Sequence, residues 1–185
     1  MDCRLGSLCR QMNGRLESQC KDTKNKSMAE KKNAISYESI MKDLKARKFA
    51  PVYVLMGDEP FYIDKICDYI AENVLQPEER DFNQTVLFGA DTTAVQVVDQ
   101  CKGYPMMAEF RVVIVKEAQN LKSLDALEKY LEKPVKSTIL VICNKNGSID
   151  RRKKFIPRAE QVGVVFESKK LYDRQLPGFI ETYLK

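Results

Sequence analysis

Short apolar runs alternate along this chain with segments in which apolar residues recur every three or four positions. The runs show little polar alternation, which is typical of strands buried on both faces of a parallel sheet. The five expected strands are residues 52–56, 84–89, 111–115, 137–143 and 163–167. The pattern therefore predicts a mostly parallel sheet.

The segments between these runs have the spacing of amphipathic helices. The expected helices are residues 36–48, 60–75, 91–102, 124–131, 151–161 and 174–185. Ser36 would cap the first helix, and Asp91 or Thr92 would cap the third. The residues expected to face the core are Ile63, Ile66, Cys67, Ile70 and Val74 in the second helix and Val95, Val98 and Cys101 in the third. Alternating strands and helices predict a three-layer, P-loop-like α/β fold with helices on both faces of the sheet.

The pattern changes at both ends of the chain. Residues 1–33 are polar and aperiodic, so we expect a poorly ordered N-terminal extension, with Met28 as the natural start. Residues 34–169 hold the predicted α/β domain. Residues 170–185 are expected to begin a second, helical domain that is truncated here.

Composition narrows the chemistry. The 185 residues include no His, which excludes an imidazole base or metal ligand, and the net charge of +5 permits an acidic partner without requiring one. The six cysteines form no C-x-x-C pair, so we expect no metal site and reduced thiols in a cytoplasmic protein. Cys67, Cys101 and Cys143 should pack as small hydrophobes. No apolar run has the length of a membrane-spanning helix.

The turn after the first strand lies where nucleotide-binding α/β proteins place their phosphate loop. It consists of Gly57, Asp58, Glu59 and Pro60. A Walker A loop, G-x-x-x-x-G-K-[ST], would need Gly, Lys and Ser or Thr where the chain has Tyr62, Ile63 and Asp64. The carboxylates of Asp58, Glu59 and Asp64 would repel a phosphate. We therefore expect no nucleotide cofactor here. These residues alone leave two interpretations open: a degenerate phosphate loop, or an ordinary turn that never bound a nucleotide.

Two further positions at which P-loop ATPases contact magnesium or phosphate are also informative. P-loop ATPases place a magnesium-holding Asp after the third strand, where this chain has Lys116 and then Glu117. Asn144, after the fourth strand, stands where such folds keep a polar phosphate sensor. Without a phosphate loop, a turn residue is the favoured interpretation of Asn144.

A second candidate site precedes the third strand. It consists of Tyr104, Pro105, Met106 and Met107. Gly103 and Pro105 should end the preceding helix and leave these residues on a loop. Two adjacent methionines on a loop cannot easily both face the core. They either fold back onto the sheet or serve as flexible apolar anchors for a partner.

A third candidate is a run of four cations: Arg151, Arg152, Lys153 and Lys154. Such a run can contact the phosphates of DNA or an acidic partner. A solvated helix end is the commoner role, and the absence of interleaved aromatic residues favours it further.

Two segments carry a resemblance to a known family. They are PVYVLMGDEPFYIDK (residues 51–65) and VDQCKGYPMMAEFRVVIVKEAQNL (residues 98–121), and the tail LYDRQLPGFIETYLK adds to them. Together they resemble the delta subunit of the bacterial DNA polymerase III clamp loader, from about residue 51 to the end. The second segment departs from the family in having a Met pair where Leu and Phe are familiar.

The resemblance implies a function. It implies an AAA+-like module without ATPase activity, an accessory subunit of the DNA polymerase III holoenzyme, which is a nucleotidyltransferase complex. This module would bind the sliding clamp through Met106 and Met107, open its ring, work beside ATP-binding loader subunits and lie close to primed DNA. The family's later domains, including its collar, would be absent from this chain. A nucleic-acid-binding domain and a divergent nucleotide-binding enzyme are the alternatives.

Overall fold

The computed structural model describes residues 35–122, 125–149 and 154–170. They belong to one compact unit of the chain, residues 35–185. The elements run in the order α2 (Tyr37–Lys45), β1 (Val52–Gly57), α3 (Pro60–Asn73), α4 (Pro77–Asn83), β2 (Gln84–Phe88), α5 (Ala94–Lys102), β3 (Arg111–Lys116), η2 (Ala118–Asn120), α6 (Asp125–Glu132), β4 (Thr138–Lys145), α7 (Phe155–Val162) and β5 (Val164–Ser168).

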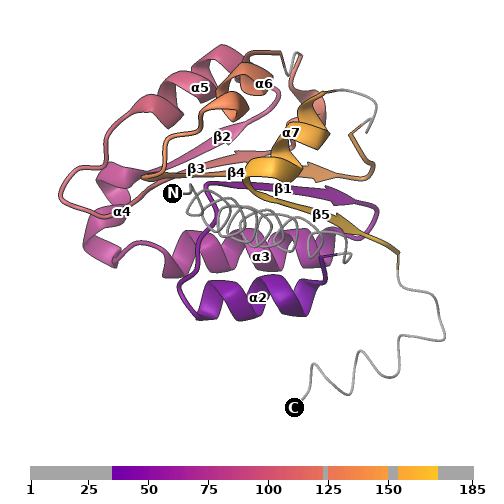
Figure 1. The fold of residues 1–185 in the computed structure, drawn as a ribbon, viewed down its shortest axis with the longest axis horizontal. Coiled ribbons are helices and arrows are strands. Elements are labelled where there is room, and N and C mark those ends of the chain that lie inside the picture. Colours follow the sequence, from indigo (N-terminus) through magenta and orange to yellow (C-terminus); the bar gives the residue numbers. More distant parts are fainter. Residues whose placement is uncertain (1–34, 123–124, 150–153, 171–185) are drawn as a thin grey trace, which may run out of the picture. The chain divides into compact units, whose positions relative to one another are not determined.

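The five strands form one sheet in the order β2-β3-β4-β1-β5. Every neighbouring pair is parallel, and Val54 of β1 lies beside Ile142 of β4 on one side and Val165 of β5 on the other. Helices α2 and α3 cover one face of the sheet, and α5, α6 and α7 cover the other (Figure 1). The predicted three-layer α/β fold is confirmed, and all of its strands are parallel.

The core lies in two layers, one on each face of the sheet. In β1, Val52, Val54 and Met56 pack toward α5, α6 and α7, whereas Tyr53 and Leu55 pack toward α2 and α3. All five side chains are buried, because successive residues of a strand point to opposite faces and both faces are covered. The apolar runs of the sequence therefore mark the interior strands correctly.

Three details of the helices differ from the expectation. Helix α4 was missed altogether. The N-cap of α5 is Thr93, which exchanges hydrogen bonds with Gln96, and neither Asp91 nor Thr92 has this role. Val95 was wrongly placed in the core and is 60% exposed, because the buried stripe of α5 is formed by Ala94, Val97, Val98 and Cys101.

Two boundaries also shift along the chain. Strand β4 continues to Lys145, two residues beyond the expected end at residue 143, so Asn144 lies in the strand and not in a turn. Helix α7 begins at Phe155, and residues 151–153 of the expected helix lie outside the described residues. The helix expected at residues 174–185 lies outside them too.

The three cysteines of the described residues are buried and carry free thiols. Burial raises the pKa of the Cys101 thiol to about 12, as expected for a small hydrophobic core residue. Within the described part of the chain, no helix has the length and apolar character needed to cross a membrane, and no group of three or more His, Cys, Asp or Glu side chains could hold a metal ion.

Candidate partner-binding site

The loop of residues 103–110 connects α5 to β3 and lies at the amino end of β3. Helix α5 ends at Lys102 with Gly103 as its C-cap, as the Gly and Pro of this segment predicted. In Figure 1 the loop passes next to α4, at the edge of the sheet formed by β2.

Three side chains among residues 104–107 of this loop are exposed. Met107 is 101% exposed, Met106 60% and Tyr104 85%, while Pro105 is half-buried. The alternative in which both methionines fold back onto the sheet is therefore wrong. An apolar side chain that is fully exposed gains most from burial against a partner.

The backbone of the loop is held in the middle by a buried residue, Asn83, the last residue of α4. The Asn83 Oδ1 accepts a hydrogen bond from the Met106 N–H at 2.6 Å, and Asn83 Nδ2 donates to the Met106 carbonyl at 2.9 Å. The next residue, Met107, has a φ of 54°, in the left-handed region that non-glycine residues seldom occupy.

Both ends of the loop are also packed. Arg111 donates from Nη2 to Gln100 Oε1 at 2.7 Å, and its guanidinium lies so close to Gly103 that a Cβ there would be 3.1 Å from Arg111 Cζ. At the far end, the ring of Phe110 packs edge-on against Phe49 with centroids 5.6 Å apart. Exposed side chains thus stand on a backbone that is fixed at three places.

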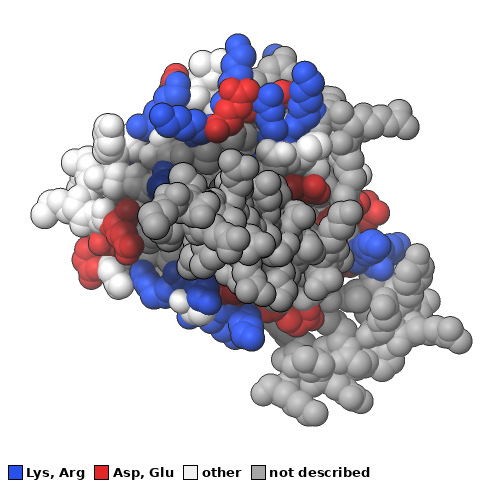
Figure 2. Space-filling view, in the orientation of Figure 1, with Lys and Arg blue, Asp and Glu red and all other residues white. Residues whose placement is uncertain are grey.

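Other apolar side chains are exposed near the loop and along the edge strand. Phe82 of α4, the residue before Asn83, is 64% exposed, and Val86 and Phe88, which follow further along β2 toward its carboxyl end, are 43% and 47% exposed. In Figure 2, the left edge of the molecule, where Figure 1 places α4 and the loop, is mostly white with acidic groups below it. Such a concentration of exposed apolar side chains is typical of a protein–protein contact.

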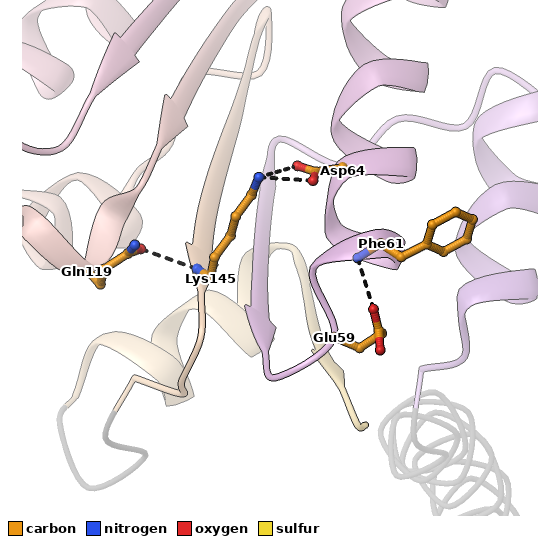
Figure 3. A network of polar contacts seen from close by, with 5 residues as sticks. All are labelled: Glu59, Phe61, Asp64, Gln119 and Lys145. Atoms are coloured by element: carbon orange, nitrogen blue, oxygen red, sulfur yellow. Dashed lines mark hydrogen bonds and ion pairs between the residues drawn. The ribbon is translucent and has the colours of Figure 1, made fainter. Parts of the chain in front are cut away.

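The turn after β1 has a different character. The Gly57 N–H donates to the Gly147 carbonyl at 3.0 Å, and the Asp58 N–H donates to the Ser168 carbonyl at 3.2 Å. Glu59 caps α3 by accepting from the Phe61 N–H at 3.4 Å (Figure 3), and Pro60 at the start of the helix has no N–H. These donors of the phosphate-loop position are satisfied within the protein.

The Asp64 carboxylate, expected to repel a phosphate, forms an ion pair within the domain. Its oxygens pair with Lys145 Nζ at 2.6 and 2.9 Å (Figure 3), which links α3 to the end of β4. The hydrogen bond to Asp64 raises the pKa of Lys145. The Lys145 N–H donates to Gln119 Oε1 at 3.2 Å, so this ion pair belongs to a network that ties three segments together.

The other candidate residues are accounted for in part. Asn144 is buried, and its Nδ2 donates to the Gly147 carbonyl at 2.8 Å, which supports a structural role for it. Lys154 is exposed beside the start of α7. Arg151, Arg152 and Lys153 lie outside the described residues.

Asn83 is the residue of this site that the sequence analysis missed, together with its helix. A signal for the start of α4 was present: Pro77 at the first helical position and a glutamate three residues after Gln76. The Gln76 N–H indeed donates to Glu79 Oε2 at 2.9 Å. That signal locates a helix, but it says nothing of a contact between Asn83 and Met106.

The fold and the site together define a class: a parallel, three-layer α/β domain with apolar side chains exposed on a loop at the amino end of its sheet. The model of the family "DNA polymerase III, delta subunit" matches residues 53–169, which is more than half of the chain. The chain belongs to the DNA polymerase III delta subunit family, as its sequence motifs had indicated.

Two further comparisons agree with this assignment. The chain is 27% identical over 150 residues to DNA polymerase III subunit delta of Bacillus subtilis, across 76% of this chain and 43% of the relative. The solved structure of the Bacillus subtilis DNA clamp loader delta protein superposes with a TM-score of 0.69 at 26% identity, covering 78% of this chain and 45% of that one. The chain thus spans less than half the length of the relatives it matches.

Proposed function

We propose that this chain binds the sliding clamp of the replication machinery and helps to open its ring, without hydrolysing ATP itself. Met106 and Met107 are the anchors, flanked by Pro105 and Tyr104. Membership of the delta subunit family supports this proposal, and so does the name of the similar Bacillus subtilis protein, a DNA clamp loader delta protein. The other loader subunits are its partners, and the site of action is the bacterial cytoplasm.

The observation that carries the proposal is the exposure of Met107 and Met106 on a loop whose backbone is fixed. A soluble domain that points its methionines outward leaves apolar area in water, which is unfavourable unless a partner covers it. Burying two Met side chains in a pocket of the clamp contributes roughly 3–6 kcal/mol before the costs of association.

Ring opening follows from such binding without a power stroke by this chain. A domain that binds the open form of the clamp better than the closed form shifts the population toward the open form. A hundredfold preference, about 2.7 kcal/mol, raises the ratio of open to closed clamp by the same factor. The two methionines supply that difference only to the extent that they are buried more completely against the open form than against the closed form.

The lack of ATP hydrolysis is supported by the first turn. The N–H groups of Gly57 and Asp58 already bond to Gly147 and Ser168, and the chain has no Gly-Lys-Ser/Thr sequence at the end of the loop. Energy from ATP would then come from other subunits of the loader. Saturable binding of magnesium–ATP in equilibrium dialysis would instead favour the alternative of a nucleotide-binding enzyme.

The double variant Met106→Ala with Met107→Ala tests the proposal. We expect titration calorimetry to show binding of the purified sliding clamp from the same organism to the wild-type chain and none to the variant. Val95→Ala is the matched control, because Val95 is an apolar residue of α5 that is as exposed as Met106, at 60%. Circular dichroism should show all three proteins folded. Unchanged affinity in the double variant would remove the loop from the binding site.

A further inference from the structure

Asn83 stands out among the polar side chains of the described residues because it is fully buried, at 0% exposure, next to a loop of exposed side chains. Its amide bonds to both the N–H and the C=O of Met106, at 2.6 and 2.9 Å. Its Nδ2 also donates to the Glu79 carbonyl one turn back in α4, at 3.0 Å. The contact joins segments 23 residues apart in the sequence.

We propose that Asn83 is a positioning residue for the clamp-binding loop, which it holds in the conformation that presents Met107. The inference rests on the function proposed above. Asn83 itself is buried beneath the loop and acts on the partner only through Met106 and Met107.

The chemistry of the side chain suits this role. Pairing with both backbone groups of one residue requires one acceptor and one donor at a fixed separation, which a carboxamide has. An aspartate of the same size keeps the acceptor and loses both donations, and an alanine loses all three hydrogen bonds. The Asn83 carboxamide therefore pairs with the N–H and the C=O of Met106, as the backbone of a neighbouring antiparallel strand does.

Asn83 affects binding through the conformational freedom of the loop. Without Asn83 the loop is free to leave the left-handed turn at Met107, whose φ is 54°, because that conformation is unfavourable for a residue with a Cβ. A loop that moves in the free protein must be ordered again when the clamp binds, and this cost appears as weaker affinity.

Asn83→Ala, with Asn144→Ala as control, tests the inference in the titration with the sliding clamp. Asn144 is also buried and also donates to a backbone carbonyl, but it lies at the carboxyl end of β4, at the opposite end of the sheet from the loop. We expect about tenfold weaker clamp binding for Asn83→Ala and less than about a twofold change for Asn144→Ala. Equal affinities for the wild type and Asn83→Ala would overturn the inference.

Amide hydrogen exchange in the free protein gives a second readout that a general loss of stability would not reproduce. In Asn83→Ala the Met106 amide should exchange about tenfold faster or more, while the amides of Val113 and Ile142 in the central strands keep their protection. Asn83→Asp sharpens the result, because its carboxylate still accepts from Met106 N–H. In this variant the Met106 amide should stay protected while clamp affinity falls.

The two arms separate the two possible failures. If the wild-type chain does not bind the clamp, the proposed function is wrong, and exchange at Met106 still shows whether Asn83 holds the loop. If the clamp binds but Met106 exchanges at the same rate in wild type and Asn83→Ala, the positioning role is wrong. If Asn83→Ala does not fold, the titration with Asn83→Asp tests the role instead, because this variant loses both Nδ2 donations and is also expected to bind the clamp more weakly; wild-type affinity in Asn83→Asp would then overturn the inference.

Discussion

The turn after β1 and the loop before β3 lie at opposite ends of the same parallel sheet, and they treat their polar and apolar groups in opposite ways. At the turn, the N–H groups that an α/β protein commonly offers to a phosphate bond to Gly147 and Ser168. At the loop, the backbone bonds internally through Asn83, but the side chains of Met106 and Met107 face the solvent. At one end of the sheet these backbone donors bond within the chain, and at the other apolar side chains face the solvent.

The two ends of the sheet therefore differ in what they offer to a ligand or a partner. Ligand sites of open α/β sheets usually lie at the carboxyl ends of the strands, where helix N-termini are free. Here the turn at that end bonds within the chain, including an isolated bridge between Gly57 and Gly147, and a small pocket remains beside Gly57, Asp58 and Glu167. The amino end carries the exposed methionines, so the proposed recognition there is by apolar contact instead of by hydrogen bonding to a small ligand.

The largest effect is expected from adding a side chain at Gly57, in the turn after β1. Gly57 has a φ of 134°, and a Cβ on it would lie 2.0 Å from the Ser168 carbonyl oxygen, so Gly57→Ala combines backbone strain with a clash against β5. We expect it to lower the free energy of unfolding by more than about 4 kcal/mol, or to prevent folding.

Gly147→Ala is the matched control for that variant. Its φ is 150°, but a Cβ there would meet no atom within 4 Å among the described residues, so only the backbone strain applies. We expect a loss of about 1–3 kcal/mol in urea-induced unfolding. Similar losses for the two variants would show that the contact with Ser168 is not what shapes the turn.

The next effect concerns the other end of the sheet. Met107→Ala should weaken clamp binding about ten- to hundredfold, because a fully exposed side chain has the most area to bury. Met106→Ala should weaken it less, since Met106 is already two-fifths covered at 60% exposure in the free protein. Neither variant should change the free energy of unfolding by more than about 0.5 kcal/mol. A larger affinity loss for Met106 than for Met107 would contradict this order.

The sequence predicted the sheet well because burial on both faces leaves a clear signature. Runs such as Val112–Val115 contain no polar residue, and the structure buries each of their side chains. It also predicted that residues 104–107 lie on a loop, from Gly103 and Pro105. Helix placement was weaker in α5, where Val95 and Ala94 each begin a stripe of helical spacing and only packing decides between them.

Contacts between distant residues could not be predicted in this way. Helix α4 has seven residues and no apolar face, so periodicity gives no signal for it. Asn83 meets Met106 across 23 residues, and Asp64 meets Lys145 across 81. Propensity and spacing describe neighbours along the chain, whereas these pairs exist only because the sheet order brings their elements together.

The smallest effect is expected at the Asp64–Lys145 ion pair. Its side chains are 46% and 28% exposed, so solvent screens the attraction, and Asp64→Asn should lower the free energy of unfolding by less than about 1 kcal/mol at neutral pH. The pKa of Lys145 is raised above its usual 10.5 by the hydrogen bond to Asp64. The contribution of this pair is therefore fully present below pH 10.5 and is lost as the pH rises through the pKa of Lys145 in the folded protein.

Urea unfolding of the wild type and Asp64→Asn, measured at neutral pH and again above pH 10.5, should give a small difference that shrinks toward zero. Added salt at neutral pH should shrink it too, because an exposed pair is screened. Lys145→Met should resemble Asp64→Asn, since each variant removes one partner of the same contact. A difference that does not shrink as Lys145 loses its proton would mean that Asp64 stabilises the fold by contacts other than the one to Lys145.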